Sequence, residues 1–516
     1  MFSKVNSIGL QGFSAQLVEV EADLSAGLPR FDLVGLPGSS VSEARERVRA
    51  AIKNGGWEFP ISRITVNLAP AEFRKTGTCY DLPILLAILS AGKQWKAPDA
   101  DTVVLGEVSL DGALRPVKGM LPMLLAAKEL GMQSALIPAA NAAEASVVSG
   151  MTIYGISTLK ELEKHLSGEA SISPIQTMTY QQEDLVTPAD TAGFGAVDFS
   201  DIRGQVQAKL GMEIAAAGGH NILLTGTPGA GKSMLAKALP TILPAMTYGE
   251  ALETTKVYSV AGLLPPGQAL VTERPFRAPH HSATSVSLSG GGNQSRPGEV
   301  SLANNGVLFL DELPLFQRHV LESLRQPLED RQITITRNRF SATYPCNLML
   351  VCAMNPCPCG YQGDTRRHCT CTPQQIKSYK SKISGPLLDR IDIQIAVSPV
   401  DWSDLMGESS RTPLETSADI RKRVEAARAL QRQRFNGTGI VSNACIPASQ
   451  VRQYCALEPD AEQVLIQAFQ ALHLSARAND KILRTARTVA DLNERSTIAR
   501  EDLLQAIQFR SLLFQS

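Results

Sequence analysis

The sequence predicts an α/β protein with two successive α/β units followed by a helical region. Three features of the chain lead to this prediction. Strand-like and helix-like runs alternate from the start of the chain to about residue 165. A short apolar run near residue 222 leads into a glycine-rich loop and then a helix, the order expected in a nucleotide-binding parallel sheet. Beyond about residue 401 the chain is charged and has helical periodicity.

Length and charge limit the classes of protein to consider. A chain of 516 residues is too long for one ordinary core, so two to four domains are expected. The 50 basic residues balance 50 acidic ones, which argues against a protein that coats nucleic acid or an anionic membrane over its whole surface but allows a local basic stripe. Nine cysteines, the lack of a secretory leader and the lack of a long apolar run predict a soluble, cytoplasmic protein with reduced thiols and no membrane partner.

The first predicted unit covers residues 1–166 and is an α/β domain of its own. Its expected strands are Ala15–Val20, Ile64–Leu68, Thr102–Leu105 and Ser134–Ile137, and its expected helices are Val41–Lys53, Leu82–Ala91 and Leu121–Leu130. Residues 167–197 are rich in Ser, Thr, Gln, Pro and Ala and show little periodicity, which predicts a linker.

The second unit is predicted over residues 198–400. Its candidate strands are apolar enough to be buried on both faces of a parallel sheet: Asn221–Thr225, Gly306–Leu310, Asn347–Met354 and Ile391–Val397. Residues 401–516 are expected to form a small helical bundle beside this unit, with helices at Ala418–Phe435, Ala461–Leu472, Lys481–Asn493 and Arg500–Phe509.

A phosphate-binding loop follows the first strand of the second unit. The pattern GxxxxGKS is filled by Gly226, Thr227, Pro228, Gly229, Ala230, Gly231, Lys232 and Ser233. Glycines let backbone N–H groups face a polyphosphate, and the helix N-terminus adds its partial positive charge. We expect the Lys232 ammonium to reach the outer phosphates and the Ser233 hydroxyl to ligate Mg²⁺, so the loop predicts ATP and Mg²⁺. A chance glycine-rich turn is the alternative, which the order of strand, loop and helix disfavours.

Polar residues at the ends of two later strands complete the predicted ATPase site. The run Gly306–Leu310 ends in Asp311 and Glu312. Asp311 is expected to hold Mg²⁺, and Glu312 to polarise the water that attacks the γ-phosphorus. The strand Asn347–Met354 leads to Asn355, whose amide can bind the γ-phosphate or the attacking water. An ordinary acidic turn and an Asn-Pro turn are the structural alternatives.

The segments GTPGAGKS, LFLDE, MNP and SGPLLDRID together resemble AAA+ ATPases, in the branch that contains magnesium-chelatase ATPase subunits and MCM-like helicases. The resemblance covers about residues 198–516 and implies an AAA+ P-loop parallel sheet with a helical lid. It also implies that Asn355 senses the γ-phosphate and that Arg390 is an arginine finger for a neighbouring subunit's ATP, in a hexameric ring. Arg477, in the segment LSAR, resembles the second sensor, with Arg484 as the less favoured candidate.

Four cysteines follow Asn355 in a short insertion, residues 356–373: Cys357, Cys359, Cys369 and Cys371. Four thiolates can supply the tetrahedral sulfur set that structural Zn²⁺ prefers, although the usual spacing is CxxC rather than CxC. Inert buried thiols are the alternative, but the surrounding loop residues offer little core. We therefore predict structural Zn²⁺ here, with His368 as an alternative ligand.

Alternating residues between the acidic pair and Asn355, from Arg331 to Phe340, predict a strand that leads to a turn. Alternation would place Arg337 and Arg339 on one face, which in most proteins is a solvated hairpin face. MCM-like ATPases project a hairpin from this place into the ring channel, so the resemblance implies that these arginines contact DNA phosphates. The segment 274–296 resembles an insertion of the same branch, and we expect a mobile loop near the channel or the nucleotide rather than a metal site at its paired histidines.

The first unit resembles a Lon-protease-like domain. Its segments LVGLP, RITVNLAP and KTGTCYDLP are similar to those of the ComM/YifB family, and with the ATPase motifs and the cysteine loop this resemblance spans nearly the whole chain. A Lon-type peptidase needs a serine nucleophile and a lysine base, whereas here those positions fall at Cys79 and Leu121. Lys118 lies near, but the dyad is incomplete. We therefore expect a non-proteolytic domain used for assembly or for partner and DNA contacts.

Membership of this family implies a hexameric ATPase and DNA helicase that couples ATP hydrolysis to DNA strand movement and branch migration, during recombination in natural transformation. The implied partners are single-stranded and branched DNA, other copies of the chain, and recombination proteins. Two alternatives come from other classes. One is a magnesium-chelatase-like ATPase that remodels a protein partner without DNA, and the other is an ATP-dependent protease, which the residue at position 121 disfavours.

Overall fold

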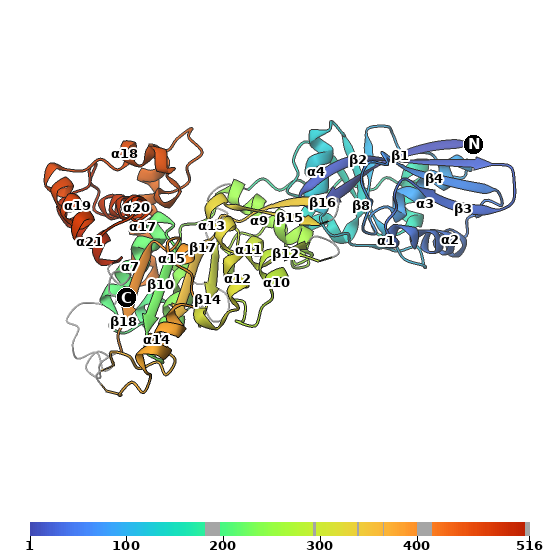
Figure 1. Ribbon diagram of the computed structural model, residues 1–516. Helices are drawn as coiled ribbons and strands as arrows, with labels where there is room; N and C mark the ends of the chain where they lie inside the picture. The colour runs from blue at the N-terminus through green and yellow to red at the C-terminus, as the bar shows by residue number, and fades with distance from the viewer. Residues whose placement is uncertain (181–196, 293–295, 338–339, 365, 400–414, 511–516) are drawn as a thin grey trace.

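The computed structural model describes residues 1–180, 197–292, 296–337, 340–364, 366–399 and 415–510 (Figure 1). Three parts follow one another along an elongated molecule: a sheet-containing unit at the N-terminus, a second unit around a parallel sheet, and a helical bundle at the far end. The predicted α/β class with a parallel sheet is therefore confirmed. None of the described helices combines the length and the apolar character needed to cross a membrane.

The first unit contains a seven-stranded sheet in the order β3-β4-β2-β1-β5-β8-β9. Its strands are β1 (Phe2–Gln11), β2 (Ser14–Ser25), β3 (Arg30–Val34), β4 (Arg63–Ala69), β5 (Thr102–Val104), β8 (Ser134–Pro138) and β9 (Thr152–Ile156). The pairs β1–β2 and β2–β4 are antiparallel, and the other pairs are parallel. Alternate apolar residues of β2, from Val18 to Leu24, are buried, which fixes the register of this strand against the core.

Helices and a short hairpin complete the first unit. They are α1 (Ser39–Ser42), α2 (Ala44–Gly55), α3 (Asp81–Ala91), β6 (Glu107–Val108), β7 (Leu114–Arg115), α4 (Met120–Glu129), α5 (Ala142–Ala145) and α6 (Leu159–Ser167). The helix expected over Val41–Lys53 is split in two at Glu43. The start of the expected linker packs on this unit, because the Ile175 N–H donates to the Ile153 carbonyl at 2.8 Å. Residues 181–196 of that linker lie outside the described residues.

The second unit contains a five-stranded sheet in the order β11-β14-β17-β10-β18, in which every pair is parallel. The strands are β11 (Phe276–Arg277), β14 (Val307–Leu310), β17 (Met349–Met354), β10 (Ile222–Gly226) and β18 (Ile393–Val397). Its helices are α7 (Val206–Gly218), α8 (Lys232–Ile242), α9 (Tyr248–Ala261), α10 (Ser285–Ser289), α11 (Glu299–Leu302), α12 (Arg318–Glu322), α13 (Arg325–Asp330), α14 (Pro373–Lys380) and α15 (Gly385–Leu388). Two hairpins extend from this unit: β12 (Gly290–Gly291) with β13 (Arg296–Pro297), and β15 (Gln332–Arg337) with β16 (Phe340–Pro345).

The C-terminal helices are α17 (Ser417–Arg434), α18 (Val451–Tyr454), α19 (Pro459–Ala471), α20 (Ala476–Leu492) and α21 (Arg500–Gln508). Helix α20 begins five residues earlier than the expected Lys481, because the Ser475 hydroxyl accepts from the Ala478 N–H and caps it. Helices α17 and α20 pack on α7, so the bundle lies directly against the parallel sheet unit.

The first two units share one hydrophobic core. The buried cluster of the first sheet also includes residues of the second unit. They are Met246 just before α9, Ala251 on α9 and Leu270 after it. The Gly119 N–H donates to the Ser259 carbonyl at 3.0 Å, and the Ser259 hydroxyl donates to the buried Glu144 carboxylate. The N-terminal unit is thus docked on α9 through buried contacts rather than merely tethered to it.

Candidate nucleotide site

The phosphate-binding loop lies between β10 and α8, in the strand–loop–helix arrangement that its pattern predicts. At Gly226 the β10 backbone approaches the Val397 carbonyl of β18 so closely that a Cβ would collide with it. Gly231, just before α8, has a φ of +91°, in the left-handed region that glycine adopts without strain. The loop therefore requires glycine at both ends to bring its N–H groups around a phosphate.

Lys232 is buried at the start of α8. Its ammonium donates to the carbonyls of Gly226 and Thr227 at 2.7 and 2.8 Å and to the Asn355 side-chain oxygen at 3.1 Å. Burial lowers the pKa of Lys232, and the charges of Asp311 and Glu312 partly oppose this effect. The lysine is thus held among oxygen atoms at the position where a phosphate oxygen can replace the carbonyls.

Asp311 follows β14 and meets the phosphate-binding loop. The Ser233 hydroxyl donates to the Asp311 carboxylate at 2.8 Å, so the two oxygen ligands expected for Mg²⁺ are adjacent. An oxygen-rich pair of this kind suits a hard divalent cation bridging to phosphates. The structure therefore brings together Lys232, Ser233, Asp311 and Asn355 from β10, β14 and β17.

Glu312 has a left-handed backbone, with a φ of +52° and a ψ of +46°. Such a conformation costs a residue with a side chain on the order of 1–3 kcal/mol and is found where function requires it. The Glu312 carboxylate is 53% exposed, and the His281 Nδ1 atom lies 3.7 Å from it. The loop that contains His281 is thus adjacent to the acidic pair, on the nucleotide side of the unit.

The two arginines expected to act on ATP lie at the opposite edge of the sheet. Arg390 precedes β18, donates to the carbonyls of Arg325 and Pro386 at 2.8 and 2.7 Å, and is paired with Glu329. Arg477, on α20, lies 3.8 Å from the same Glu329 carboxylate. Both line one cleft of about 330 Å³ between the core and the C-terminal helices, and neither is near the phosphate-binding loop of its own chain.

The β15–β16 hairpin carries one of the two arginines expected to meet DNA. Its register runs from Gln332 opposite Pro345 to Arg337 opposite Phe340. Strand β15 ends at Arg337, and residues 338 and 339 lie outside the described residues, so the placement of Arg337 and Arg339 on one face stays a prediction.

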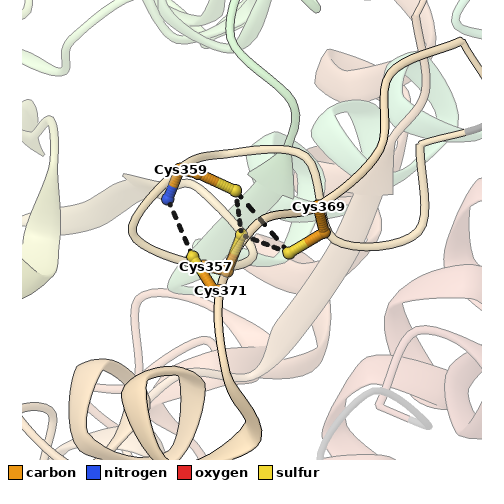
Figure 2. Close-up of side chains that lie close together, drawn as sticks. All are labelled: Cys357, Cys359, Cys369 and Cys371. Atoms are coloured by element: carbon orange, nitrogen blue, oxygen red, sulfur yellow. Dashed lines mark hydrogen bonds between the residues drawn. The ribbon is translucent and has the colours of Figure 1, made fainter.

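The four cysteines of the insertion converge as a metal-binding set would (Figure 2). The Cys357 sulfur lies 3.4 Å from that of Cys359 and 3.7 Å from that of Cys369, and all four sulfurs lie within 4.8 Å of one another. Zn–S bonds of about 2.3 Å in a tetrahedron give sulfur separations of about 3.8 Å. Backbone N–H groups, that of Tyr361 first, lower the pKa of Cys359 to about 5, which favours the thiolate that a metal binds.

The comparisons with known proteins cover almost the full chain. Residues 198–405 match the family described as magnesium chelatase, subunit ChlI, residues 20–141 match subunit ChlI of Mg-chelatase, and residues 414–510 match the C-terminal part of that subunit. Competence protein ComM of Haemophilus influenzae is 41% identical over 515 residues, 99% of this chain and 97% of ComM. The uncharacterized protein YifB of Escherichia coli is 40% identical over 513 residues, 99% of this chain and 97% of YifB. The chain belongs to the ComM/YifB family.

A shorter similarity links this ComM/YifB member to another protein. The DNA repair protein RadA of Escherichia coli is 31% identical over 156 residues, 29% of this chain and 32% of RadA. Membership of the magnesium-chelatase-like AAA+ group agrees with the parallel sheet and the phosphate-binding loop seen in the structure.

The two positions that the resemblance assigns to a Lon-type nucleophile and base, Cys79 and Leu121, are both buried in the first unit. Cys79 is buried, and burial raises the pKa of its thiol to about 12, so it is not a ready nucleophile. Leu121 is fully buried in the core. The Lys118 side chain packs against Gly262, at the C-terminal end of α9, where a Cβ would have no room. These residues build the junction with the second unit.

Sequence reasoning did not find Glu329, which binds both Arg390 and Arg477, or Asp392, which is buried and paired with Lys481 of α20. No local pattern marks either residue, because each has its partner at a distant position in the chain. Asp392 is a charged residue immediately before the buried strand β18, and that position is the best indication in the sequence of a buried ion pair.

Proposed function

We propose that this protein is a ring-forming cytoplasmic ATPase, assembled as a hexamer, that uses ATP hydrolysis to move DNA strands and to drive branch migration during recombination in natural transformation. The proposal has three parts: a site shared between neighbouring subunits, a channel that contacts DNA, and a zinc-binding insertion. Each part has its own support and its own test.

The main support for a site shared between subunits is the distance, within one chain, between the phosphate-binding loop and Arg390. At one end of β18, Val397 pairs with Gly226 of the phosphate-binding loop, and at the other end the Asn221 side chain donates to the Arg390 carbonyl at 3.0 Å. A five-residue strand spans about 17 Å. An arginine side chain cannot bridge that length, so we assign Arg390 to the ATP of another subunit. Arg477 lines the same cleft, and we assign it to the same interface.

Within one subunit, we assign the remaining groups to the roles that phosphoryl transfer needs. Lys232 would hold the β- and γ-phosphate oxygens, and Asn355 would bind the γ-phosphate from the next strand. Ser233 and Asp311 would hold Mg²⁺, which supplies charge neutralisation between the β- and γ-phosphates. Glu312, whose side chain is exposed, would orient the attacking water and accept its proton. Arg390 of the neighbour would stabilise charge on the transferring group.

Support for DNA as the partner comes from the relatives and from the hairpin. ComM is named a competence protein and RadA a DNA repair protein. Six hairpins with Arg337 and Arg339 near their turns would place 12 positive charges around a central channel, which a net charge of zero conceals. The magnesium-chelatase similarity supports the competing function, a motor that remodels a protein partner without DNA.

Strand displacement on forked and three-stranded DNA separates these two functions. We expect the native protein to displace strands with ATP and its ATPase rate to rise with DNA. The double variant Arg337→Ala/Arg339→Ala should keep basal ATPase activity and lose most of the DNA response. Equal displacement by both proteins would contradict the role of the arginines, and indifference of the native ATPase to every DNA would favour the remodelling motor.

The donor set of the insertion fits structural zinc. Four sulfurs at near-tetrahedral separations, with Cys359 N–H donating to the Cys371 sulfur at 3.3 Å, form the usual environment of a Cys₄ site. When bound, zinc would crosslink the two ends of the insertion through Cys357, Cys359, Cys369 and Cys371. Metal analysis of protein purified without chelator should find about one zinc per chain; a small fraction of one would contradict the site.

A further inference from the structure

The cysteine insertion lies next to two parts of the nucleotide site, Asn355 and the phosphate-binding loop. It leaves β17 directly after Asn355 and returns to the core at α14. Cys357, the first sulfur ligand, is fully buried only two residues beyond Asn355. Any movement of the cluster therefore acts on the residue proposed to sense the γ-phosphate.

The insertion also touches the phosphate-binding loop. Gly360 has a φ of +89° and its N–H donates to the Cys357 carbonyl at 3.0 Å, which forms the turn between the first two cysteines. A Cβ at this position would lie 2.7 Å from both the Cδ and Cγ atoms of Pro228. The proline ring is rigid, so a Cβ here could be accommodated only if Pro228 and the loop backbone moved together. The turn therefore rests on the loop with no spare room.

Asn355 is held from two sides in this arrangement. Its side-chain oxygen accepts from the Lys232 ammonium at 3.1 Å. Tyr379 of α14 is close to the backbone of Asn355: burial raises the pKa of the Tyr379 hydroxyl, and the backbone of Asn355 opposes this effect. Since α14 begins two residues after Cys371, both ends of the insertion are tied to the same asparagine.

We propose that zinc bound by the four cysteines is a strut that sets the relative position of Asn355 and the phosphate-binding loop, so that metal occupancy controls nucleotide affinity and turnover. This proposal depends on the proposed function, because it assumes that Asn355 and Lys232 bind ATP. Without the metal, the turn at Gly360 loses its anchor and no longer supports Pro228. The cysteines thus act through Asn355 and the loop; they do not contact ATP themselves.

The test compares zinc-loaded and zinc-free forms of the full-length protein. Zinc is removed from the native protein by a chelator, the chelator is dialysed away, and Mg²⁺ is restored before titration with a fluorescent ATP analogue. We expect affinity to fall about tenfold and turnover about 100-fold, as expected when a catalytic group is displaced by about 1 Å. Added zinc should restore both. Circular dichroism checks that the zinc-free protein stays folded.

Two variants separate the metal from the contact that transmits its effect. Cys369→Ser/Cys371→Ser should lose zinc and reproduce the zinc-free affinity. Gly360→Ala should keep zinc and still bind nucleotide more weakly, because its Cβ displaces Pro228. Cys445→Ser removes a thiol outside the cluster and serves as the matched control, with unchanged zinc content, affinity and turnover.

The proposed role of zinc would be contradicted if the folded, zinc-free protein kept the native affinity for the ATP analogue and the native turnover. It would also be contradicted if zinc-loaded Gly360→Ala kept the native affinity. If the chelated protein or the cysteine variant unfolds, the Gly360→Ala titration alone decides. Failure of the proposed function gives a different result: the zinc-loaded native protein would bind the ATP analogue but show no hydrolysis or no response to DNA. The nucleotide titration would still test the proposed role of zinc, because the titration measures nucleotide binding and does not need hydrolysis.

Discussion

Asp392 joins the parallel sheet unit to the C-terminal helices, and replacing it by asparagine is expected to loosen that joint. Its carboxylate is buried, pairs with the Lys481 ammonium of α20, and accepts from the Asn221 N–H at 2.9 Å. The His220 Nδ1 atom lies 3.8 Å away, and burial lowers the pKa of this histidine. Lys481 is therefore the main positive charge that Asp392 balances, and Asp392→Asn would leave that ammonium buried without a counter-charge.

The size of the effect follows from the burial of both partners. Removing one member of a buried ion pair costs about 3–5 kcal/mol. The Lys481 side chain is 15% exposed and can gain some hydration, so the lower half of this range applies, about 3–4 kcal/mol. For a unit of this size each kcal/mol shifts the melting temperature by about 2–4 °C, so Asp392→Asn should melt about 6–16 °C earlier.

The pH dependence gives an independent check on the charge. Burial alone would raise the pKa of Asp392, but the charge of Lys481 and the interactions with His220 together outweigh it and hold this pKa well below its ordinary value. A carboxylate with a depressed pKa stabilises the folded state above its unfolded pKa of about 3.9 and loses that contribution as the pH falls towards its folded pKa. The stability difference between the native protein and Asp392→Asn should therefore be full at neutral pH and shrink below about pH 4.

Calorimetry and circular dichroism at several pH values measure both effects. Lys481→Met in the Asp392→Asn background removes the stranded charge and should recover at least about half of the lost stability. Nucleotide affinity serves as the control, because Asp392 and the phosphate-binding loop lie at opposite ends of β18. A stability loss below about 0.5 kcal/mol, the range of ordinary surface substitutions, would refute the reasoning.

Three further predictions concern the chemistry. Glu312→Gln should retain nucleotide affinity and lose about 100- to 1,000-fold in turnover, measured by phosphate release, because an amide cannot accept the proton of the attacking water; native turnover would remove Glu312 from this role. Lys232→Ala and Arg390→Ala should each be inactive alone, but mixed rings should regain ATPase activity, since some interfaces then combine an intact loop with an intact arginine; no recovery at any mixing ratio would count against a shared site. Cys79→Ser should leave ATPase activity unchanged, and neither it nor the native protein should cleave casein; cleavage by the native protein would restore the protease alternative.

Local sequence was sufficient to bring four residues of the candidate site together. Lys232, Ser233, Asp311 and Asn355 each follow the end of an apolar run, and in a parallel sheet the carboxyl ends of neighbouring strands share one edge. The same reasoning located the cysteine cluster, because its ligands lie close in sequence. Hydrophobic patterns placed seven of the eight predicted sheet strands to within two residues at each end, whereas the run Ala15–Val20 stops five residues short of the end of β2. Strands β1, β3, β9 and β11 were not predicted.

Contacts between distant segments were beyond such reasoning. Glu329 meets Arg390 and Arg477 only because α13, the start of β18 and α20 converge at one cleft. Periodicity describes one element at a time, and these features depend on how elements meet.

The Lon-like corner shows how a catalytic position can become structural. By resemblance Leu121 occupies the place of the peptidase lysine, and here its backbone N–H donates to Glu144 at 2.9 Å while Glu144 also accepts from Ser259 of α9. Helix α9 in turn bonds the segment that opens β14, since Glu253 accepts from Asn305 at 3.1 Å. Strand β14 ends at the acidic pair. Position 121 therefore contributes a buried apolar side chain to the core and a backbone N–H to the hydrogen-bonded joint with α9, which leads to the nucleotide site.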